Sequence, residues 1–491
     1  MNKSQCYNPF LPLSECIPDG EPHVFDGRVY LFGSHERLRG EKFCCEPYVF
    51  YSAPVDDLSR WTARGPSYSA AQDPHSTPER NCIYAPDVVR GNDGRFYLYY
   101  CLDGYAGPLS AAVCDTPDGK YEYLGDVRDP DGKPFQRFIP FDPAVLNDDG
   151  TIRLYYGTWF PFADNRTEEN TAALDAAQQQ IFGKTLEEIK GEPGGVGGPV
   201  TVELADDMLT VITEPKRIMP ARVKGTSWEE HPFFEGSSIR RIGGLYYFIY
   251  SSWNNHELCY ATSSRPDEGF VFRGTIVSNG DVGYKGRTME NKLNATGNTH
   301  GSIEKIDGQW YIFYHRHTHG TDFSRQPCAE PIEILPDGSI PQVEMTSCGL
   351  NGGPLRAEGR YPAAICCNLT HGQMPHSGTI KDGNAPASFP FISSEGNSLF
   401  VHNIEMGTWI GYKYFDFQGS CGLELTYRGD GQGQLAVSTA LEGETLAVME
   451  LEPSSEWQNT YARIPFPEKK GGLFLHYEGS GNIDLLSFTL S

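Results

Sequence analysis

Acidic side chains and one histidine stand at matching places in the sequence, just where short apolar segments begin. Two carboxylates in unlike surroundings can divide acid and base catalysis, one kept protonated to deliver a proton and the other ionised to accept one. Asp before Pro is also a common turn former, so any single one of these acids could simply shape a turn. The six residues are Asp19 and Glu21 in PDGEPHVF, Asp87 in YAPDVV, Asp142 in FDPAVL, Glu235 in FFEGSSI and His300 in NTHGSI.

Glu235 is the best candidate for the protonated member of such a pair. It follows Phe233 and Phe234 and precedes a tyrosine-rich segment. Burial among aromatic rings disfavours the charged carboxylate and raises its pKa, as a general acid requires. Glycoside hydrolysis is a reaction that uses one such acid together with an ionised carboxylate.

The elements that must position these residues form a repeat. A turn followed by an aromatic strand occurs five times, in DGRVYLFGSH, DGRFYLYYC, DGTIRLYYGTW, GGLYYFIYSSW and DGQWYIFYHRH. Asp-Gly and Gly-Gly are hairpin turns, and each unit has a short apolar strand before the turn and a more polar strand after it. Five such units predict a five-bladed β-propeller, with a large β-sandwich as the alternative. In a propeller the innermost strands start at one mouth of the central channel, so the acids would converge there.

Two further regions interrupt or follow this repeat. Residues 164–198 are rich in Ala, Gln and Glu and predict one or two helices inserted near the mouth, as a lid or a surface excursion. After Ile340 the hairpin pattern stops, and residues 346–491 alternate apolar and polar side chains over short strands. We therefore expect an all-β protein, with a propeller over residues 1–345 and a β-sandwich over residues 346–491.

Composition excludes several classes of partner. The formal net charge is −24, which would repel phosphate backbones and anionic membrane surfaces. No apolar run is long enough for a signal peptide or a membrane span, so we expect a cytoplasmic protein. The 13 cysteines show no repeating spacing and are expected to be reduced thiols. The oligomeric state is not predicted.

The ordered set of motifs, with NPFLP near the start, resembles glycoside hydrolase family 43 over residues 7–345. The resemblance implies a five-bladed propeller and inversion at the anomeric carbon. It also implies an aspartate base on the first blade, an aspartate on the third that tunes and orients the acid, and a glutamate acid on the fourth. Asp142 matches the middle aspartate and Glu235 the acid.

The base is where the sequence departs from the pattern of that family. Members commonly carry Ala-Asp-Pro at this place, whereas this chain has Asp19-Gly-Glu21-Pro22. Matching the proline favours Glu21, and counting back from the hairpin favours Asp19. We expect Asp19 to be the base, because the longer Glu21 would crowd the water that lies between carboxyls about 6.5 to 9.5 Å apart in inverting enzymes.

Other residues are expected to contact sugar or a metal. The resemblance implies that His300 faces the channel and contacts a structural calcium ion or its waters; no redox or organic cofactor is implied. Alternatively, His300 is a neutral histidine hydrogen-bonded inside the channel. Flat aromatic faces and forked donors suit sugar rings, although the aromatic residues would equally well pack between blades. The expected substrate contacts are Asp87, Trp159, Phe160, Trp253, Arg287, His300, Arg316 and Arg325.

The expected activity is removal of a terminal pentose from plant-derived oligosaccharides by an exo-acting inverting enzyme. An α-L-arabinofuranosidase is the first choice. The alternatives are a β-xylosidase, a β-galactofuranosidase, an endo-arabinanase and a non-catalytic sugar-binding propeller. The C-terminal region weakly resembles a carbohydrate-binding module of the family 6 type, in which aromatic residues would form a platform or the domain would simply buttress the propeller. The platform candidates are Trp409, Tyr412, Tyr414 and Tyr427.

Overall fold

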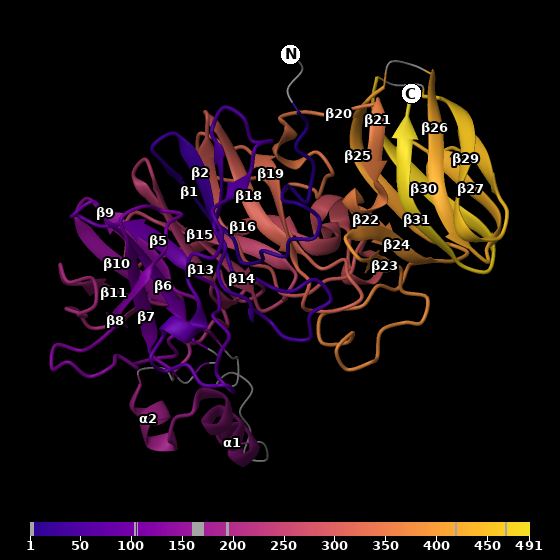
Figure 1. Cartoon of the computed structure of the whole chain (residues 1–491). Coiled ribbons are helices and arrows are strands. Elements are labelled where there is room, and N and C mark those ends of the chain that lie inside the picture. The colour runs from indigo at the N-terminus through magenta and orange to yellow at the C-terminus, as the bar shows by residue number, and fades with distance from the viewer. Residues whose placement is uncertain are drawn as a thin grey trace.

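The computed structural model describes residues 4–102, 105, 107–159, 171–192, 196–417, 420–466 and 469–491. Most of the described chain forms β-strands, as predicted, and Figure 1 shows two groups of sheets side by side. Phe160 and parts of the predicted insertion (residues 164–170 and 193–195) lie outside the described residues. In the described part of the chain, no helix is both long and apolar enough to cross a membrane.

Five antiparallel sheets follow one another along residues 21–332, each built from strands consecutive in sequence. The first sheet has β1 (Glu21–Phe25), β2 (Arg28–Phe32), β3 (Tyr51–Pro54) and β4 (Thr62–Ala63). The second has β5 (Asp87–Arg90), β6 (Phe96–Cys101), β7 (Leu109–Cys114) and β8 (Glu122–Asp126). The third has β9 (Ala144–Asp148), β10 (Thr151–Tyr156), β11 (Val200–Leu204) and β12 (Lys216–Arg217). The fourth has β13 (Phe233–Ile242), β14 (Leu245–Ser252), β15 (Glu257–Ser263) and β16 (Val271–Ser278), and the fifth has β17 (Ile303–Ile306), β18 (Gln309–Arg316) and β19 (Gln326–Ile332).

The predicted Asp-Gly turns join the first two strands of their sheets. Between β1 and β2, Asp26 and Gly27 have φ of 48° and 78°, and between β9 and β10, Asp149 and Gly150 have φ of 51° and 96°. Two successive residues with positive φ suit the tight hairpin turn whose twist matches that of the strands. The five hairpins are therefore a local consequence of the sequence.

The innermost strands of neighbouring sheets contact one another, as in a propeller: β5 meets β9, β9 meets β13, and β1 meets β17. The ring is closed between its first and last blades by a parallel bridge between Gly20 and Gly301. The fifth sheet has three strands instead of four, and its outer strand is met by Asn8, whose side chain exchanges hydrogen bonds of 2.9 and 3.0 Å with the backbone of Ala329. The chain is thus all-β, with a five-bladed propeller.

The insertion in the third blade contains two helices, α1 (Thr171–Phe182) and α2 (Leu186–Gly191), which project below the propeller in Figure 1. Thr185 caps α2: its hydroxyl accepts from the backbone N–H of Glu188, and the Glu188 carboxylate accepts from the backbone N–H of Thr185. Lys184 donates to the carbonyl of Phe138 at 2.8 Å. These contacts attach the helices to the segment that leads into β9.

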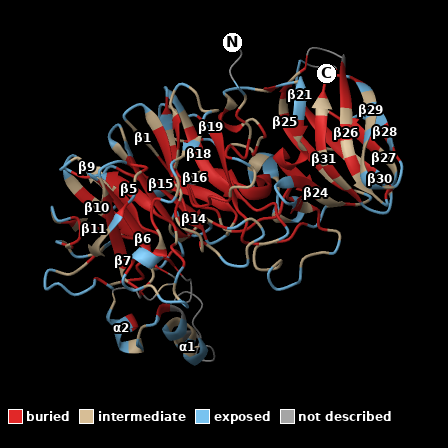
Figure 2. Ribbon diagram, viewed as in Figure 1, coloured by how far each residue is buried: buried red, intermediate tan, exposed pale blue. Residues whose placement is uncertain are grey.

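The C-terminal region forms two further sheets of six strands each. One contains β20 (Leu355–Arg356), β22 (Asn368–Thr370), β25 (Trp409–Asp416), β27 (Gln432–Ser438), β28 (Ala447–Leu451) and β30 (Lys470–Ser480). The other contains β21 (Gly359–Pro362), β23 (Phe391–Glu395), β24 (Ser398–Ile404), β26 (Ser420–Gly429), β29 (Ser454–Pro465) and β31 (Ile483–Leu490). Side chains from both sheets form one buried cluster, and Figure 2 shows the continuous buried interior of these strands.

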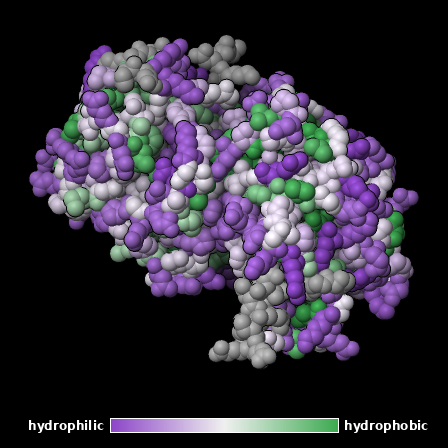
Figure 3. All heavy atoms as spheres, turned by 180° about the vertical axis from the view of Figure 1, so that it is seen from behind, coloured by the Kyte–Doolittle hydropathy of each residue, from purple (hydrophilic) through white to green (hydrophobic). Residues whose placement is uncertain are grey.

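Buried polar contacts join this region to the propeller. The Arg316 guanidinium, at the end of β18, donates to the carbonyls of Ala364 and Cys366 at 2.6 and 2.7 Å. The Lys413 ammonium of β25 binds Asp281 at 3.3 Å. The rear surface of the molecule is mainly hydrophilic, with apolar residues in small separate groups (Figure 3). All 13 cysteines are free thiols.

Candidate active site

A cavity of about 290 Å³ opens where the innermost strands begin. Three of the predicted catalytic acids line it, together with His300 and Arg325. Asp19, Asp142 and Glu235 come from the first, third and fourth blades, and His300 and Arg325 both come from the fifth. The full lining is Asp19, Phe43, Cys44, Tyr84, Tyr105, Phe141, Asp142, Phe234, Glu235, Asn255, Asn298, His300, Arg325 and Ser377.

Asp19 lies just before β1 with a φ of 59° and is buried. Its carboxylate accepts from Arg325 Nη1 at 3.0 Å and Nη2 at 3.4 Å, and its backbone N–H donates to His315 Nδ1 at 3.2 Å. The other side of the guanidinium is held by Glu36, which accepts from Arg325 Nε at 3.0 Å and Nη2 at 2.7 Å. Because an arginine shared by two carboxylates is fixed in position, Asp19 is held as an oriented carboxylate facing the cavity.

Glu235 is placed by an irregularity in β13. The pairing of β13 with β14 shifts register on both sides of Glu235, and Gly236 has a φ of 73°. Such a bulge re-aims a side chain relative to the regular strand. Burial raises the pKa of Glu235 to about 7; the hydrogen bond from Asn298 Nδ2 to Oε1, 3.2 Å long, opposes the rise and the charge of Asp19 adds to it.

Asp142 is connected to the same bulge. Its Oδ2 accepts from the backbone N–H of Gly236 at 3.1 Å and lies 3.8 Å from His300 Nδ1. Burial raises the pKa of Asp142 well above its ordinary value; the neighbouring His300 opposes this, and the charges of Glu235 and Asp19 add to it. Asp142 can therefore fix the backbone next to Glu235 and influence its proton affinity.

Glu21 does not line the cavity. Its side chain is fully buried in the channel, where Oε2 accepts from Ser238 Oγ and Arg240 Nη2, both at 3.1 Å. Although burial raises the pKa of Glu21, His300 and Arg240 outweigh it and hold the pKa below its ordinary value. Of the two candidates for the base, only Asp19 is on the cavity wall.

The implied calcium ion fits the residues present at this point of the channel. Glu21 Oε1 and both ring nitrogens of His300 are buried without a hydrogen-bond partner among the described residues. Oε1 and Nε2 lie 3.7 Å apart, close to the spacing of two adjacent ligands that each bind calcium at about 2.3–2.6 Å. Glu21 and His300 would hold the ion, and water would complete its shell. A bound calcium would supply positive charge beside Asp142.

Three predicted substrate contacts are corrected by the structure. Asp87 is fully buried, and its carboxylate accepts from the backbone N–H groups of Val88 and Val145 at 2.7 and 2.8 Å. It therefore joins two inner strands. Arg316 is buried and binds the C-terminal carbonyls described above. Arg287 donates to the carbonyl of Asn291 at 2.8 Å and lies outside the catalytic cavity.

The predicted contacts Trp159 and Trp253 do not line the cavity. Trp159 is buried and packs edge-on against Trp253, with ring centres 6.2 Å apart, and Trp253 in turn packs against Phe234 at 5.0 Å. Phe234 is the member of this group that lines the cavity. The predicted C-terminal platform is wrong in part, because Tyr412 and Tyr427 are buried in the shared core of the two sheets.

Several residues of the wall were not identified from the sequence. Phe43, Tyr84, Tyr105, Phe141 and Asn298 lie in irregular segments, where no periodicity marks a side chain as facing inward. The one available signal was Asn298, two residues before His300 in the NTHGSI motif.

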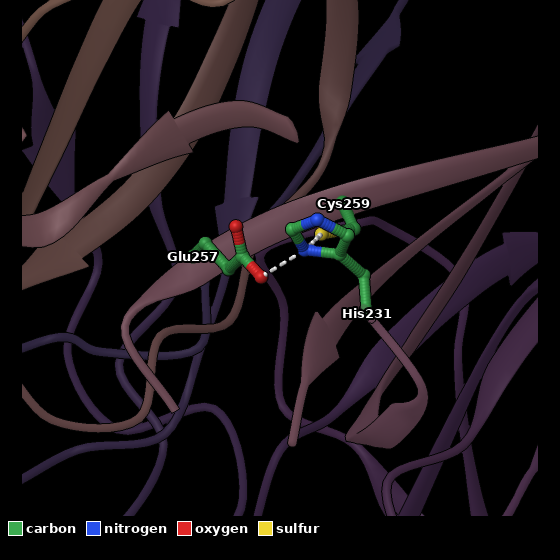
Figure 4. A group of neighbouring side chains, drawn as sticks. All are labelled: His231, Glu257 and Cys259. Atoms are coloured by element: carbon green, nitrogen blue, oxygen red, sulfur yellow. Dashed lines mark hydrogen bonds and ion pairs between the residues drawn. The ribbon is translucent and has the colours of Figure 1, made fainter. Parts of the chain in front are cut away.

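A turn beside the cavity is held by the residues drawn in Figure 4. Glu257 Oε1 accepts from His231 Nδ1 at 2.6 Å and from Ser252 Oγ at 2.7 Å, and the Cys259 sulfur lies 4.0 Å from the same ring nitrogen (Figure 4). Glu257 Oε2 accepts from Thr275 at 2.6 Å. Both carboxylate oxygens are thus satisfied by protein donors, which marks a hydrogen-bonded support for the turn between β14 and β15 instead of a metal centre.

The cavity combines the two groups that acid–base cleavage of a glycosidic bond requires. Glu235 has a pKa near neutrality, so it can carry a proton at neutral pH. Asp19 is held by Arg325 at 3.0 Å on the same cavity wall, where its carboxyl group is placed to accept a proton from water. This division of roles suits general acid and general base catalysis.

Comparison with known proteins agrees with this chemistry. A xylosidase/arabinosidase of Thermoclostridium stercorarium is 44% identical over 99% of both chains. A xylosidase/arabinosidase of Bacteroides ovatus is 28% identical over 62% of this chain and 87% of its own. Among solved structures, an arabinoxylan arabinofuranohydrolase of family 43 from Bacillus subtilis, in complex with cellotetraose, matches 99% of this chain and 97% of its own at 19% identity, with a TM-score of 0.50.

The family model described as glycosyl hydrolases family 43 matches residues 49–340, which include the second to fifth blades and two of the three acids in the cavity. The match covers more than half of the chain, and the similarity to the Thermoclostridium protein runs almost from end to end. This chain therefore belongs to glycosyl hydrolase family 43 and is a glycoside hydrolase.

Proposed function

We propose that the enzyme releases a terminal pentose from plant-derived oligosaccharides with inversion, using Glu235 as the general acid and Asp19 as the general base. Asp142 orients the acid and tunes its proton affinity. The observation that carries this proposal is the convergence of these three carboxylates on one cavity. The resemblance of the Thermoclostridium xylosidase/arabinosidase along the whole chain supports the pentose.

The size of the cavity supports exo action. At about 290 Å³ it lies at the small end of the range for ligand sites, roughly 300–1,000 Å³. A cavity of this size suits one terminal sugar better than an open groove along a polymer. The two candidate activities are α-L-arabinofuranosidase and β-xylosidase, because the similar proteins are described by both activities. The first choice is the arabinofuranosidase, as in the sequence-based prediction.

The function is tested with 4-nitrophenyl α-L-arabinofuranoside, β-D-xyloside and β-D-galactofuranoside. We expect the wild type to release nitrophenol from the arabinofuranoside or the xyloside. Asp19→Asn should lower kcat about 10²- to 10⁴-fold, the range for loss of a general base. Proton NMR of the first sugar released should show the inverted anomer. A folded wild type that cleaves none of the three, nor short arabino- or xylo-oligosaccharides, would contradict the proposal.

Glu21→Gln serves as the matched variant for the base. Because Glu21 lies in the channel behind His300, this variant should retain far more activity than Asp19→Asn, and its main effect should be on stability. If kcat fell more in Glu21→Gln than in Asp19→Asn, Glu21 would be the base instead of Asp19.

We also propose a structural calcium ion between Glu21 and His300. Chelation with EDTA should lower the Tm of the wild type, and added calcium should restore it. Glu21→Gln should make the Tm insensitive to both treatments. A wild-type Tm that does not respond to EDTA or calcium, with no calcium detected by elemental analysis, would contradict this site.

A further inference from the structure

The segment 371–390 joins β22 to β23 and so belongs by sequence to the C-terminal sheets (orange in Figure 1), yet it docks on the propeller. His376 forms a parallel bridge with Thr296. The backbone N–H of Ser377 donates to the carbonyl of Thr296 at 2.6 Å, and the N–H of Thr296 donates to the carbonyl of Pro375 at 3.1 Å. The segment is therefore joined by backbone hydrogen bonds to the irregular stretch that carries Asn298 and His300 and leads into β17.

Two further contacts fix the segment on either side of this bridge. Asp322, which follows β18, accepts from the backbone N–H groups of Gly378 and Lys381 at 3.3 and 3.0 Å. Met374 and Phe389 bury their side chains against Ala295 of the propeller. Polar and apolar contacts together hold residues 374–381 against the mouth of the cavity.

Ser377 is the residue of this segment that reaches the catalytic cavity. The segment passes so close to the propeller that a Cβ atom added at Gly297 would lie 2.6 Å from Ser377 Cβ. The next residue, Asn298, donates to the acid Glu235. Ser377 is half-buried, and its hydroxyl makes no hydrogen bond to another described residue, so the hydroxyl is available to a ligand.

We propose that Ser377 is a specificity-determining residue, and that segment 371–390 forms, through Ser377, the part of the cavity wall that faces the sugar unit that leaves. The inference rests on the proposed function, because it takes Glu235 as the acid. A general acid protonates the glycosidic oxygen, and the groups around that acid therefore face the leaving portion of the substrate. The ligand at this wall is the pentose unit of the oligosaccharide from which the terminal sugar is removed.

Ser377→Trp tests this wall by filling it. The oligosaccharide substrate is an arabinose-substituted xylotriose or xylotriose, and the nitrophenyl glycoside of the same terminal sugar is the comparison. In this variant we expect kcat/KM for the oligosaccharide to fall at least about 10-fold more than kcat/KM for the nitrophenyl glycoside, because the flat nitrophenyl leaving group is smaller. Ser377→Ala adds no bulk, so it should also lower kcat/KM for the oligosaccharide relative to the nitrophenyl glycoside, but by a smaller factor. Ser388→Trp is the control, because Ser388 lies in the same segment away from the cavity. The inference would be overturned if Ser377→Trp lowered kcat/KM equally for both substrates. It would also be overturned if Ser388→Trp changed the ratio of the two kcat/KM values as much as Ser377→Trp does.

Chemical labelling provides a readout that does not depend on turnover. In a Glu235→Gln background, the thiol introduced by Ser377→Cys should react more slowly with iodoacetamide when xylotriose or arabinotriose is added, whereas the thiol introduced by Ser388→Cys should not. Peptide mass spectrometry distinguishes both from the native cysteines. Failure of the wild type on every glycoside would contradict the proposed function and, with it, this inference. Unprotected labelling at position 377 would sink this inference alone.

Discussion

At the scale of single residues, the chemistry depends on the unequal surroundings of similar carboxyl groups. Asp19 is held by Arg325, Asp142 by a backbone N–H, and Glu235 by the weaker donor Asn298. Burial is common to all three, but among them Asp19 is the one that forms an ion pair with an arginine. The same type of side chain can therefore take two different roles, base and acid, in one cavity.

Glu235→Gln should affect substrates according to their leaving groups. Activity on oligosaccharides should fall about 10²- to 10⁴-fold, because a sugar alcohol leaves only when it is protonated. Activity on nitrophenyl glycosides should fall much less, since nitrophenolate leaves without a proton. Parallel kcat/KM measurements on the two substrate types check this. An equal loss on both would contradict Glu235 as the acid.

The raised pKa of Glu235 also predicts two pH effects. Oligosaccharide hydrolysis by the wild type should decline as the pH rises through about 7, where the acid loses its proton. Stability should change as well. A carboxyl that titrates near 4.3 when unfolded and near 7 when folded lowers the stability progressively between these pH values, by on the order of 4 kcal/mol in full.

Glu235→Gln removes this cost. The Tm of the variant should equal that of the wild type near pH 4 and exceed it increasingly up to about pH 7. Thermal melts across this range measure the difference. A difference in Tm that does not depend on pH would show that the Glu235 pKa is not raised by folding.

At the scale of elements, the bulge in β13 aligns the acid with its partners. Gly236 is placed so that an added Cβ would lie 3.1 Å from the His300 ring, at a φ of 73°. A regular strand would turn Glu235 away from the cavity or push this backbone into His300, because side chains alternate between the two faces of a sheet. Glycine is thus required here for both its φ and its close approach to a neighbour.

A pair of glycine substitutions separates these two requirements. Gly243, in the turn between β13 and β14, has a φ of 61° and nothing within 4 Å of an added Cβ. Gly243→Ala should cost about 1 kcal/mol of stability and leave kcat unchanged, whereas Gly236→Ala should also lower kcat by 10-fold or more, roughly the effect of a misplaced catalytic group. Comparable kcat values in the two variants would show that the bulge does not position the acid.

At the scale of the whole molecule, the propeller and the C-terminal sheets are joined by buried charge. The Arg316 guanidinium is buried and donates hydrogen bonds to two carbonyls of the C-terminal region in place of water. Without Arg316, those carbonyls would lose this donor. We therefore expect the wild type to unfold in one calorimetric transition. Arg316→Met should lower the free energy of unfolding by about 3 kcal/mol, from two charge-assisted hydrogen bonds. Two separated transitions in the wild type would contradict this coupling.

The sequence predicted those features that follow from local rules. The five hairpins depend on Asp-Gly and Gly-Gly turns, and the starts of the strands before these turns predicted that Asp19, Asp142, Glu235 and His300 lie at one mouth, where the cavity places them. The boundary between the two regions near residue 345 stays a prediction. Asp87 was wrongly predicted to contact substrate. Its position at a strand start does not reveal that its carboxylate accepts hydrogen bonds from two backbone N–H groups.

Contacts between segments distant in sequence could not be predicted in this way. Arg316 and Arg325 look alike on the chain, but one points to the C-terminal carbonyls and the other into the cavity. Ser377 lies in a segment without periodicity, and only the tertiary fold brings it to Asn298. Such pairings depend on how the ring closes and on what docks against it.

Closure of the ring between Gly20 and Gly301 has a consequence for the order in which the protein matures during synthesis. The base and the arginine that orients it are separated by 306 positions, so Asp19 leaves the ribosome long before Arg325 is translated. A nascent chain can form its early blades and still have no oriented base. With Asp19 as the proposed base, hydrolysis therefore requires that the last blade has been made.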